Sequence, residues 1–176
     1  VEGIGRYGGT WERVVEEGWN WDITHIMSYA AMVRFSPQGL PLVPHVAKSW
    51  TVSPDNREFT FTLRKKMKWS DGEPFTADDL LYWWEHECLD SAISSTPPPI
   101  MMVRGEAGYL EKLGPYEVKF VFPHPNGLFL MRLATWDGFW GMLNAPAHYL
   151  GKYHPSIGDK ALIEKAMKAR RITDPV

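Results

Sequence analysis

The sequence has one cysteine, no long apolar run and no excess of either charge. Because Cys88 is the only cysteine among 176 residues, it can form no disulfide within the chain. No stretch approaches the ~20 consecutive apolar residues that a membrane-spanning helix needs. Lysine and arginine number 19 against 21 aspartate and glutamate, and the longest basic run is Arg64–Lys66. The composition therefore argues against a nucleic-acid-binding surface and against nucleic acid as a partner.

An initiator methionine and a basic-then-apolar leader are also missing, since the chain begins at Val1. We interpret it as a piece of a longer protein, about whose targeting the missing leader says nothing. The length predicts one ordinary domain that buries roughly 70% of the surface of the unfolded chain. What the sequence has in excess is aromatic residues, at 14% with nine tryptophans. Rigid, flat rings suit ligand-binding surfaces as well as cores.

Strict alternation predicts two strands. Phe59, Phe61 and Leu63 share one face of the first, which pairs with 50–52 in a hairpin, and 116–122 alternates in the same way. The clearest helix signal follows Phe75: Thr76 is the N-cap, Asp79 takes the capping-box position, and the helix runs from 77 to about 89. Further expected elements are a strand at 12–15, an amphipathic helix at 23–35, a turn at 36–39, and helical segments at 128–133, 146–150 and 160–171. This order predicts an α+β fold with a mostly antiparallel sheet and flanking helices.

Catalytic and metal chemistry find little support in the motifs. Asp71, Glu73, Asp78 and Asp79 invite comparison with the carboxylate pair of a glycoside hydrolase. However, Asp71 precedes Gly72 in a turn, and Asp78 and Asp79 suit a helix N-terminus. The run Glu85–Cys88 lacks the pairing of histidines at i and i+4 that a zinc-binding helix uses, and the other histidines have no metal-type spacing. We therefore predict no catalytic residue, no metal ligand and no cofactor.

Two loops combine tryptophan with a directed polar group. Trp19–Asp22 and Thr135–Trp140 each place two tryptophans beside aspartate or asparagine. Apolar faces with a few polar groups are typical of a concave small-molecule site. An equally open alternative is that these rings pack onto the domain or onto chain that is absent here.

Three segments carry a resemblance to a known family. They are Val46–Asp55 (V-A-K-S-W-T-V-S-P-D), Phe59–Lys65 (F-T-F-T-L-R-K) and Lys68–Asp79 (K-W-S-D-G-E-P-F-T-A-D-D). Together they resemble the family 5 extracellular solute-binding proteins of ABC importers, the oligopeptide-, dipeptide- and nickel-binding group. The resemblance continues at Leu113–Phe120 and in the A-P-A-H-Y-L run at 145–150.

The resemblance implies a fold of two lobes that close over a ligand, of which this much shorter chain would supply part of lobe I. Residues 1–40 would form the first strand and helix of that lobe, and 41–176 its small hairpin-containing subdomain. The implied function is non-enzymatic. The protein would capture an extracellular solute, most readily a peptide, and deliver it to an ABC permease. Its implied location is extracytoplasmic, either in the periplasm or as a lipoprotein on the outer face of the membrane.

In relatives the ligand contacts come from variable loops that face the cleft, and three stretches match them by position. The expected ligand-binding residues are Trp19, Asn20, Trp21, Asp22, Pro99, Met101, Trp136, Asp137 and Phe139. Two other functions stay open at this point. One is a secreted carbohydrate-active hydrolase or its binding module, and the other is a structural domain whose aromatic residues only pack.

Overall fold

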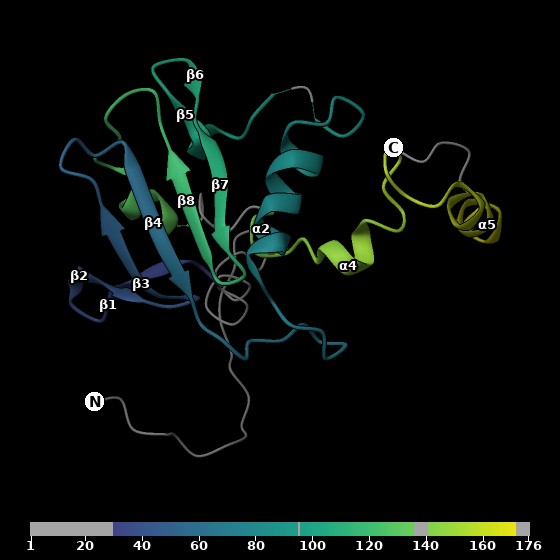
Figure 1. Ribbon diagram of the computed structural model, residues 1–176, viewed down its shortest axis with the longest axis horizontal. Helices are drawn as coiled ribbons and strands as arrows, with labels where there is room; N and C mark the ends of the chain where they lie inside the picture. Colours follow the sequence, from purple (N-terminus) through teal and green to yellow (C-terminus); the bar gives the residue numbers. More distant parts are fainter. Residues whose placement is uncertain (1–29, 95, 136–140, 172–176) are drawn as a thin grey trace, which may run out of the picture.

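A four-stranded antiparallel sheet forms the centre of the fold (Figure 1). The computed structural model describes residues 30–94, 96–135 and 141–171. The sheet has the order β3-β4-β8-β7. Its strands are β3 (Ala47–Val52), β4 (Glu58–Leu63), β8 (Glu117–Val121) and β7 (Tyr109–Gly114). The predicted hairpin, the strand at 116–122 and the α+β fold class are confirmed.

One face of this sheet carries the core, as the alternation predicts. Phe59, Phe61 and Leu63 of β4 are each at most 1% exposed. In the register with β8, Phe59 stands opposite Phe120 and Phe61 opposite Val118, so the inward residues of both strands meet on the same face. Phe120 and Val118 are also fully buried. Cross-strand pairs of this kind are the unit by which a sheet gains stability.

Helix α3 (Phe129–Leu133) covers that face. The ring of Phe129 contacts those of Phe59, Phe120 and Phe122 at centroid distances of 4.9, 5.1 and 4.8 Å. Phe129 is fully buried. One residue of a short helix thus joins two strands of the sheet into a single aromatic core.

The predicted helix at 23–35 is wrong over its described part. Val33–Ser36 is strand β1, which pairs antiparallel with β2 (Gly39–Pro44), and Gly39 with φ of 91° shapes the turn expected at 36–39. The apolar residues of so short a run fit both a helical and an alternating period. Backbone pairing with β2 decides for the strand. Residues 23–29, like the strand expected at 12–15, lie outside the described residues.

The capped helix begins at the predicted residue. Helix α2 (Ala77–Tyr82) has Thr76 as N-cap, and both hydrogen bonds of the capping box with Asp79 are present. It continues as η1 (Trp83–Cys88), a stretch of π-helix that the sequence pattern did not indicate. The helical run therefore ends close to the predicted residue 89. Trp83, Trp84 and Cys88 are all buried on it.

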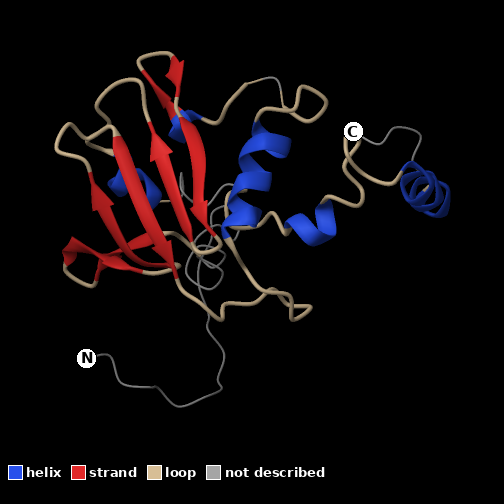
Figure 2. Cartoon of the chain, in the orientation of Figure 1, coloured by secondary structure: helices blue, strands red, loops and turns tan. Residues whose placement is uncertain are grey.

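The described residues also form a short turn, a small hairpin and two further helices. They are the 3-10 turn η2 (Pro99–Met101), the small hairpin of β5 (Met102–Val103) and β6 (Glu106–Ala107), and the helices α4 (Ala147–Leu150) and α5 (Lys160–Arg170). The helices expected near 128–133, 146–150 and 160–171 are confirmed. Helix α5 stands away from the sheet at the far end of the molecule (Figure 2). Within the described residues, no helix combines the length and the apolar character that crossing a bilayer requires.

Candidate functional site

Most of the expected ligand-binding residues lie outside the described part of the chain. This holds for Trp19, Asn20, Trp21 and Asp22 of the first loop and for Trp136, Asp137 and Phe139 of the second. Pro99 and Met101 are described and belong to η2. The described residues that border these two stretches are Ala30, Thr135 and Gly141.

Segment η2 is tied to the helix that precedes the second aromatic loop. Arg132 of α3 donates a hydrogen bond from Nη1 to the carbonyl oxygen of Pro99 at 2.9 Å. Pro99 is exposed. Met101 is fully buried, which supports a packing role for its side chain. A ligand contact through that side chain stays a prediction. Because Arg132 comes four residues before Trp136, two of the three expected ligand stretches begin from one connected region.

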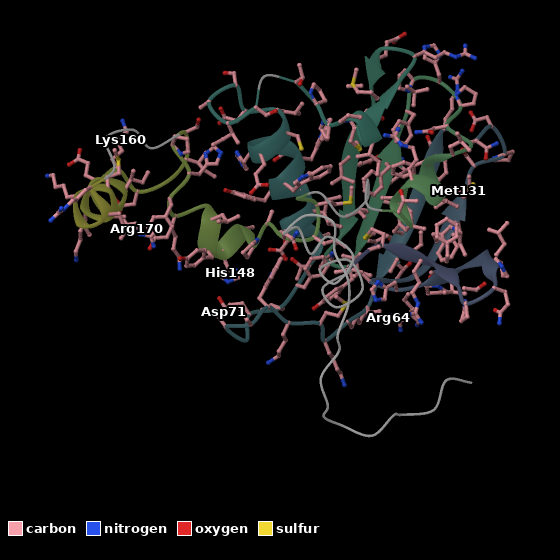
Figure 3. The ribbon with its side chains drawn as sticks, turned by 180° about the vertical axis from the view of Figure 1, so that it is seen from behind. Arg64, Asp71, Met131, His148, Lys160 and Arg170 are labelled. Atoms are coloured by element: carbon pink, nitrogen blue, oxygen red, sulfur yellow. The ribbon has the colours of Figure 1, made fainter. Side chains whose placement is uncertain are left out.

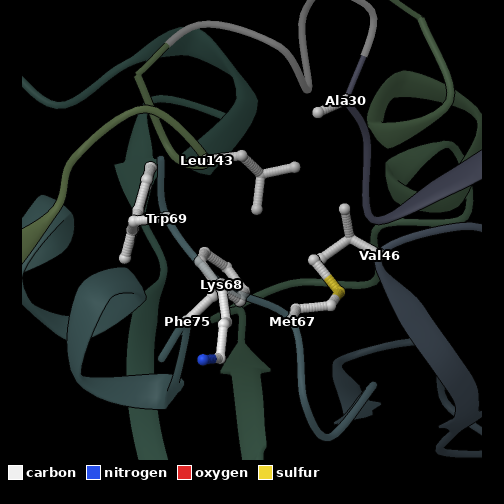
Figure 4. Close-up of a pocket in the computed structure, with 7 residues that line it drawn as sticks. All are labelled: Ala30, Val46, Met67, Lys68, Trp69, Phe75 and Leu143. Atoms are coloured by element: carbon white, nitrogen blue, oxygen red, sulfur yellow. The ribbon is translucent and has the colours of Figure 1, made fainter. Parts of the chain in front are cut away.

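A small apolar cavity lies beside residues that border segments 1–29 and 136–140, which the structure does not describe (Figure 4). Its volume is about 150 Å³. The residues that line it are Ala30, Val46, Met67, Lys68, Trp69, Phe75 and Leu143. Ala30 directly follows the first undescribed segment, and Leu143 comes shortly after the second. Ligand pockets for whole small molecules measure roughly 300–1,000 Å³, so this cavity suits one side chain or one small group.

The family-like run Lys68–Asp79 builds the wall of this cavity. The amide of Trp69 donates to the carbonyl of Glu73 at 2.8 Å, and the amide of Phe75 donates to the carbonyl of Met67 at 2.9 Å. Gly72 makes the turn with φ of 94°. The rings of Trp69 and Phe75 then meet edge to face at 5.5 Å. A tight turn thus sets two aromatic side chains against one cavity.

The cavity wall also carries an unsatisfied donor. Within the described residues, the indole Nε1 of Trp69 is buried without a hydrogen-bond partner. An unmet buried donor costs roughly 1–3 kcal/mol. A carbonyl or hydroxyl oxygen that reached this nitrogen would recover that cost. The cavity therefore offers mainly apolar contact, and the indole of Trp69 in its wall keeps a donor to spare among the described residues.

The four carboxylates that suggested a hydrolase are occupied otherwise or exposed. Asp71 accepts a hydrogen bond from the amide of Glu73 at 3.1 Å, and its Oδ2 lies 2.7 Å from Nε2 of His148 (Figure 3). The hydrogen bond with His148 is the largest cause that holds the pKa of Asp71 below its usual range, followed by the amide of Glu73. Asp78 pairs with Lys112.

Asp79 is the buried member of this set, at 3% exposure. Its Oδ2 accepts from the amide of Thr76 at 2.8 Å, and its Oδ1 accepts from the amide of Ala147 at 3.0 Å. Asp71 and Asp79 therefore both hold the start of α4. This explains why the run at 68–79 and the run at 145–150 occur together, and it leaves these carboxylates in structural roles.

Two further results concern reactive groups. Cys88 is buried, and burial, followed by the charge of Glu87, raises the pKa of its thiol to about 12, so the thiol is a poor nucleophile. Sequence reasoning overlooked a cluster of His86, Asp90 and His154, whose potential ligand atoms lie within 4.8 Å of one another. Only the i, i+4 spacing of His86 and Asp90 was visible in the sequence.

Comparison with protein families matches residues 41–155 to the bacterial extracellular solute-binding proteins, family 5 middle. Among curated proteins, the chain is 32% identical over 174 residues to the periplasmic alpha-galactoside-binding protein of Rhizobium meliloti, which covers 88% of this chain and 24% of that protein. It is 31% identical over 130 residues to di/tripeptide-binding protein 2 of Pseudomonas aeruginosa, covering 66% of the chain and 24% of the relative. The chain thus spans about a quarter of the length of these relatives.

Solved structures agree in fold. An oligopeptide-binding protein OppA superposes with a TM-score of 0.76 at 36% identity, covering 94% of this chain and 25% of that one. The binding protein MelB of Agrobacterium fabrum C58, in complex with stachyose, gives 0.59 at 29% identity over 78% of this chain and 21% of its own. Both likenesses cover a part of the larger proteins and most of this chain.

Proposed function

The chain belongs to the bacterial extracellular solute-binding proteins of family 5, and we propose that it is part of the solute-binding component of an ABC importer. The matched range, 41–155, carries this proposal, because it contains the whole central sheet and the helices α2, α3 and α4. In the proposed mechanism two lobes close around a solute by hinge motion, and the closed form delivers it to the permease. We propose that the protein lies outside the cytoplasmic membrane, either free in the periplasm or anchored to the membrane by a lipid. Cell fractionation with and without detergent separates these two.

We propose a peptide as the solute. The likeness to an oligopeptide-binding protein covers nearly the whole chain, and a di/tripeptide-binding relative points the same way. An oligosaccharide is the second candidate, since relatives that are named for alpha-galactosides or hold stachyose are also similar. Both ligand classes present carbonyl or hydroxyl oxygens beside apolar faces. That chemistry fits the apolar cavity wall and the indole N–H of Trp69, which has no hydrogen-bond partner among the described residues.

The ligand contacts are proposed at the three stretches expected from the sequence. Residues 19–22 and 136–139 would supply aromatic faces with adjacent polar groups, and Pro99 would present backbone beside them. The full burial of Met101 argues against a ligand contact through its side chain. The division into residues 1–40 and 41–176 of lobe I belongs to the same proposal.

A non-enzymatic role is proposed rather than a secreted hydrolase. A glycosidase needs two free carboxyl groups roughly 5–10 Å apart across a cleft. Asp71 and Asp79 hold the start of α4 by hydrogen bonds, and Asp78 is paired with Lys112. These contacts support architectural roles for the carboxylates that motivated the hydrolase.

Native mass spectrometry tests the proposal. The protein encoded by the longest open reading frame that contains this sequence is purified without added ligand, and released small molecules are identified. A peptide released unchanged supports the proposal, and an intact oligosaccharide replaces the ligand class. Hydrolysed products of added substrates would favour the enzyme. Failure to bind any peptide or oligosaccharide from a defined panel would refute the receptor function.

Variants of the same protein test the site. Trp136→Ala should weaken ligand binding by at least about tenfold, since burying an aromatic ring contributes more than 1.4 kcal/mol, while the unfolding midpoint stays unchanged. Tyr109→Ala is the matched control, because Tyr109 is an exposed aromatic residue of the edge strand β7. If Trp136→Ala unfolds the protein instead, that ring packs in the core and the loop assignment is wrong.

A further inference from the structure

Three potential metal ligands converge at the end of η1. His86 lies on that segment, Asp90 follows it one helical turn later, and His154 comes from the loop after α4. One ligand atom from each lies within 4.8 Å of the other two. The side chain of His154 is 3% exposed and that of Asp90 is 16% exposed. Such burial is unusual for two polar side chains that face each other, and it calls for a reason.

Neighbouring groups orient the cluster. The amide of Ala92 donates a hydrogen bond to Oδ1 of Asp90 at 2.8 Å, and the hydroxyl of Ser156 also bonds this carboxylate. The rings of His86 and His154 meet at 5.4 Å. Tyr82 packs against both, at 5.2 and 6.0 Å. These contacts fix the orientation of both rings and of the carboxylate.

Both nitrogens of the His154 ring take part in hydrogen bonds. Its Nδ1 accepts from the amide of Ser156 at 3.2 Å, which leaves the proton on Nε2. That Nε2 donates to the carbonyl of His86 at 2.9 Å and lies 3.9 Å from Oδ2 of Asp90. A cation would displace the Nε2 proton, and Nδ1 would take up a proton in exchange for the bond from Ser156. The ring stays neutral overall, so the exchange gives up two hydrogen bonds for one coordination bond.

We propose that His86, Asp90 and His154 form a binding site for a divalent transition-metal ion of the Zn²⁺ and Ni²⁺ class. Two imidazoles and one carboxylate suit this class, whereas Ca²⁺ and Mg²⁺ prefer oxygen ligands alone. Bonds of ~2.1 Å place the ligands of a tetrahedral ion roughly 3.4 Å apart. Side-chain rotation from the present separation therefore closes the site. The half-buried position of His86 leaves room for water as a further ligand.

The bound ion would fasten the loop after α4 to the end of η1. This loop, residues 151–159, leads into α5, for which no residue is buried. The proposal does not depend on the solute-binding function, because the cluster is made of three residues of this chain. Its consequence is a metal-dependent ordering of the connection to α5.

Isothermal titration of the untagged 176-residue chain with Zn²⁺ and, separately, Ni²⁺ tests the site. We expect one ion per chain, and at least about a tenfold loss of affinity in His86→Gln and in Asp90→Asn. His124→Ala is the matched control, since this histidine also faces a carboxylate, at 2.8 Å. It should bind as the unaltered chain does.

Hydrogen exchange gives an independent measurement. Addition of the metal should slow exchange in residues 152–159 of the unaltered chain and leave it unchanged in Asp90→Asn. His154→Ala is the strongest variant, but its buried ring makes loss of folding a competing outcome, so circular dichroism accompanies it. The proposal is overturned if neither ion binds at micromolar concentration, if His86→Gln and Asp90→Asn bind as tightly as the unaltered chain, or if the control loses binding.

Discussion

Replacing Asp79 with alanine should destabilise the chain far more than replacing the adjacent Asp78. The two residues have the same charge and follow each other on the first turn of α2. Asp79 is buried and accepts hydrogen bonds from the amides of Thr76 and Ala147. Asp78 is exposed and its main partner is Lys112. Comparing the two variants therefore distinguishes the loss of a buried acceptor of two hydrogen bonds from the loss of a surface ion pair.

The expected magnitude follows from the groups that each change leaves without a partner. Asp79→Ala strips two backbone N–H groups of their acceptor, at roughly 1–3 kcal/mol each, so we expect a loss of roughly 2–6 kcal/mol. For a protein of this length, that lowers the unfolding midpoint by roughly 4–24 °C. Asp79→Asn keeps one oxygen and should lose about half as much. An exposed ion pair contributes about 1 kcal/mol or less, so Asp78→Ala should shift the midpoint little.

Thermal and urea unfolding, followed by circular dichroism, measure the three variants side by side. Hydrogen exchange at the amide of Ala147 adds a local test, because that amide should exchange faster in Asp79→Ala and not in Asp78→Ala. Equal destabilisation by Asp78→Ala and Asp79→Ala would refute the reasoning. A loss under about 1 kcal/mol for Asp79→Ala would also refute it, because an exposed ion pair already contributes up to that amount.

Three further predictions follow from the packing and the charges. Phe129→Ala should cost about 3–5 kcal/mol in urea unfolding, because a fully buried ring leaves a cavity against the sheet; a loss near zero would contradict the aromatic core. The pKa of Asp71, measured by NMR, should lie below ~3.9 and rise towards it in His148→Ala. Because that pKa is lowered by folding, its stabilising effect is complete above about pH 4 and disappears as the pH falls through the lowered value. Gly141→Ala should destabilise by at least about 1 kcal/mol, since φ is 77° and the added Cβ would lie 2.8 Å from Nε1 of Trp83; an unchanged midpoint would show that the indole yields freely.

Local patterns account for the parts of the fold that were predicted. Alternation between Phe59 and Leu63 identifies β4 because successive side chains of a strand point to opposite faces. The cap at Thr76 identifies the start of α2 because its partner Asp79 lies only three residues away. Strand β7 was not predicted because it lacks such a pattern. It is an edge strand in which only Leu110 is buried, so its apolar and polar residues do not alternate.

The sequence predicted the type of site but not its location. Aromatic loops and a family-like run indicated a ligand-binding protein, but the cavity at Trp69 depends on how Ala30 and Leu143 approach the turn from distant parts of the chain. The cluster of His86 and His154 shows the same limit. These residues are 68 positions apart, and nothing in the spacing joins them.

The sequence by itself determined the elements whose signals are short in range: the hairpin of β3 and β4, the capped helix and the family. Tertiary structure decided that Val33–Ser36 pairs as a strand, that Asp71 meets His148 across 77 positions, and that Asp79 accepts from Ala147 as well as from its own cap. The physical reason is the same in each case. A periodic pattern or a cap acts over one turn or one strand, whereas these contacts form only once the sheet has brought distant segments together.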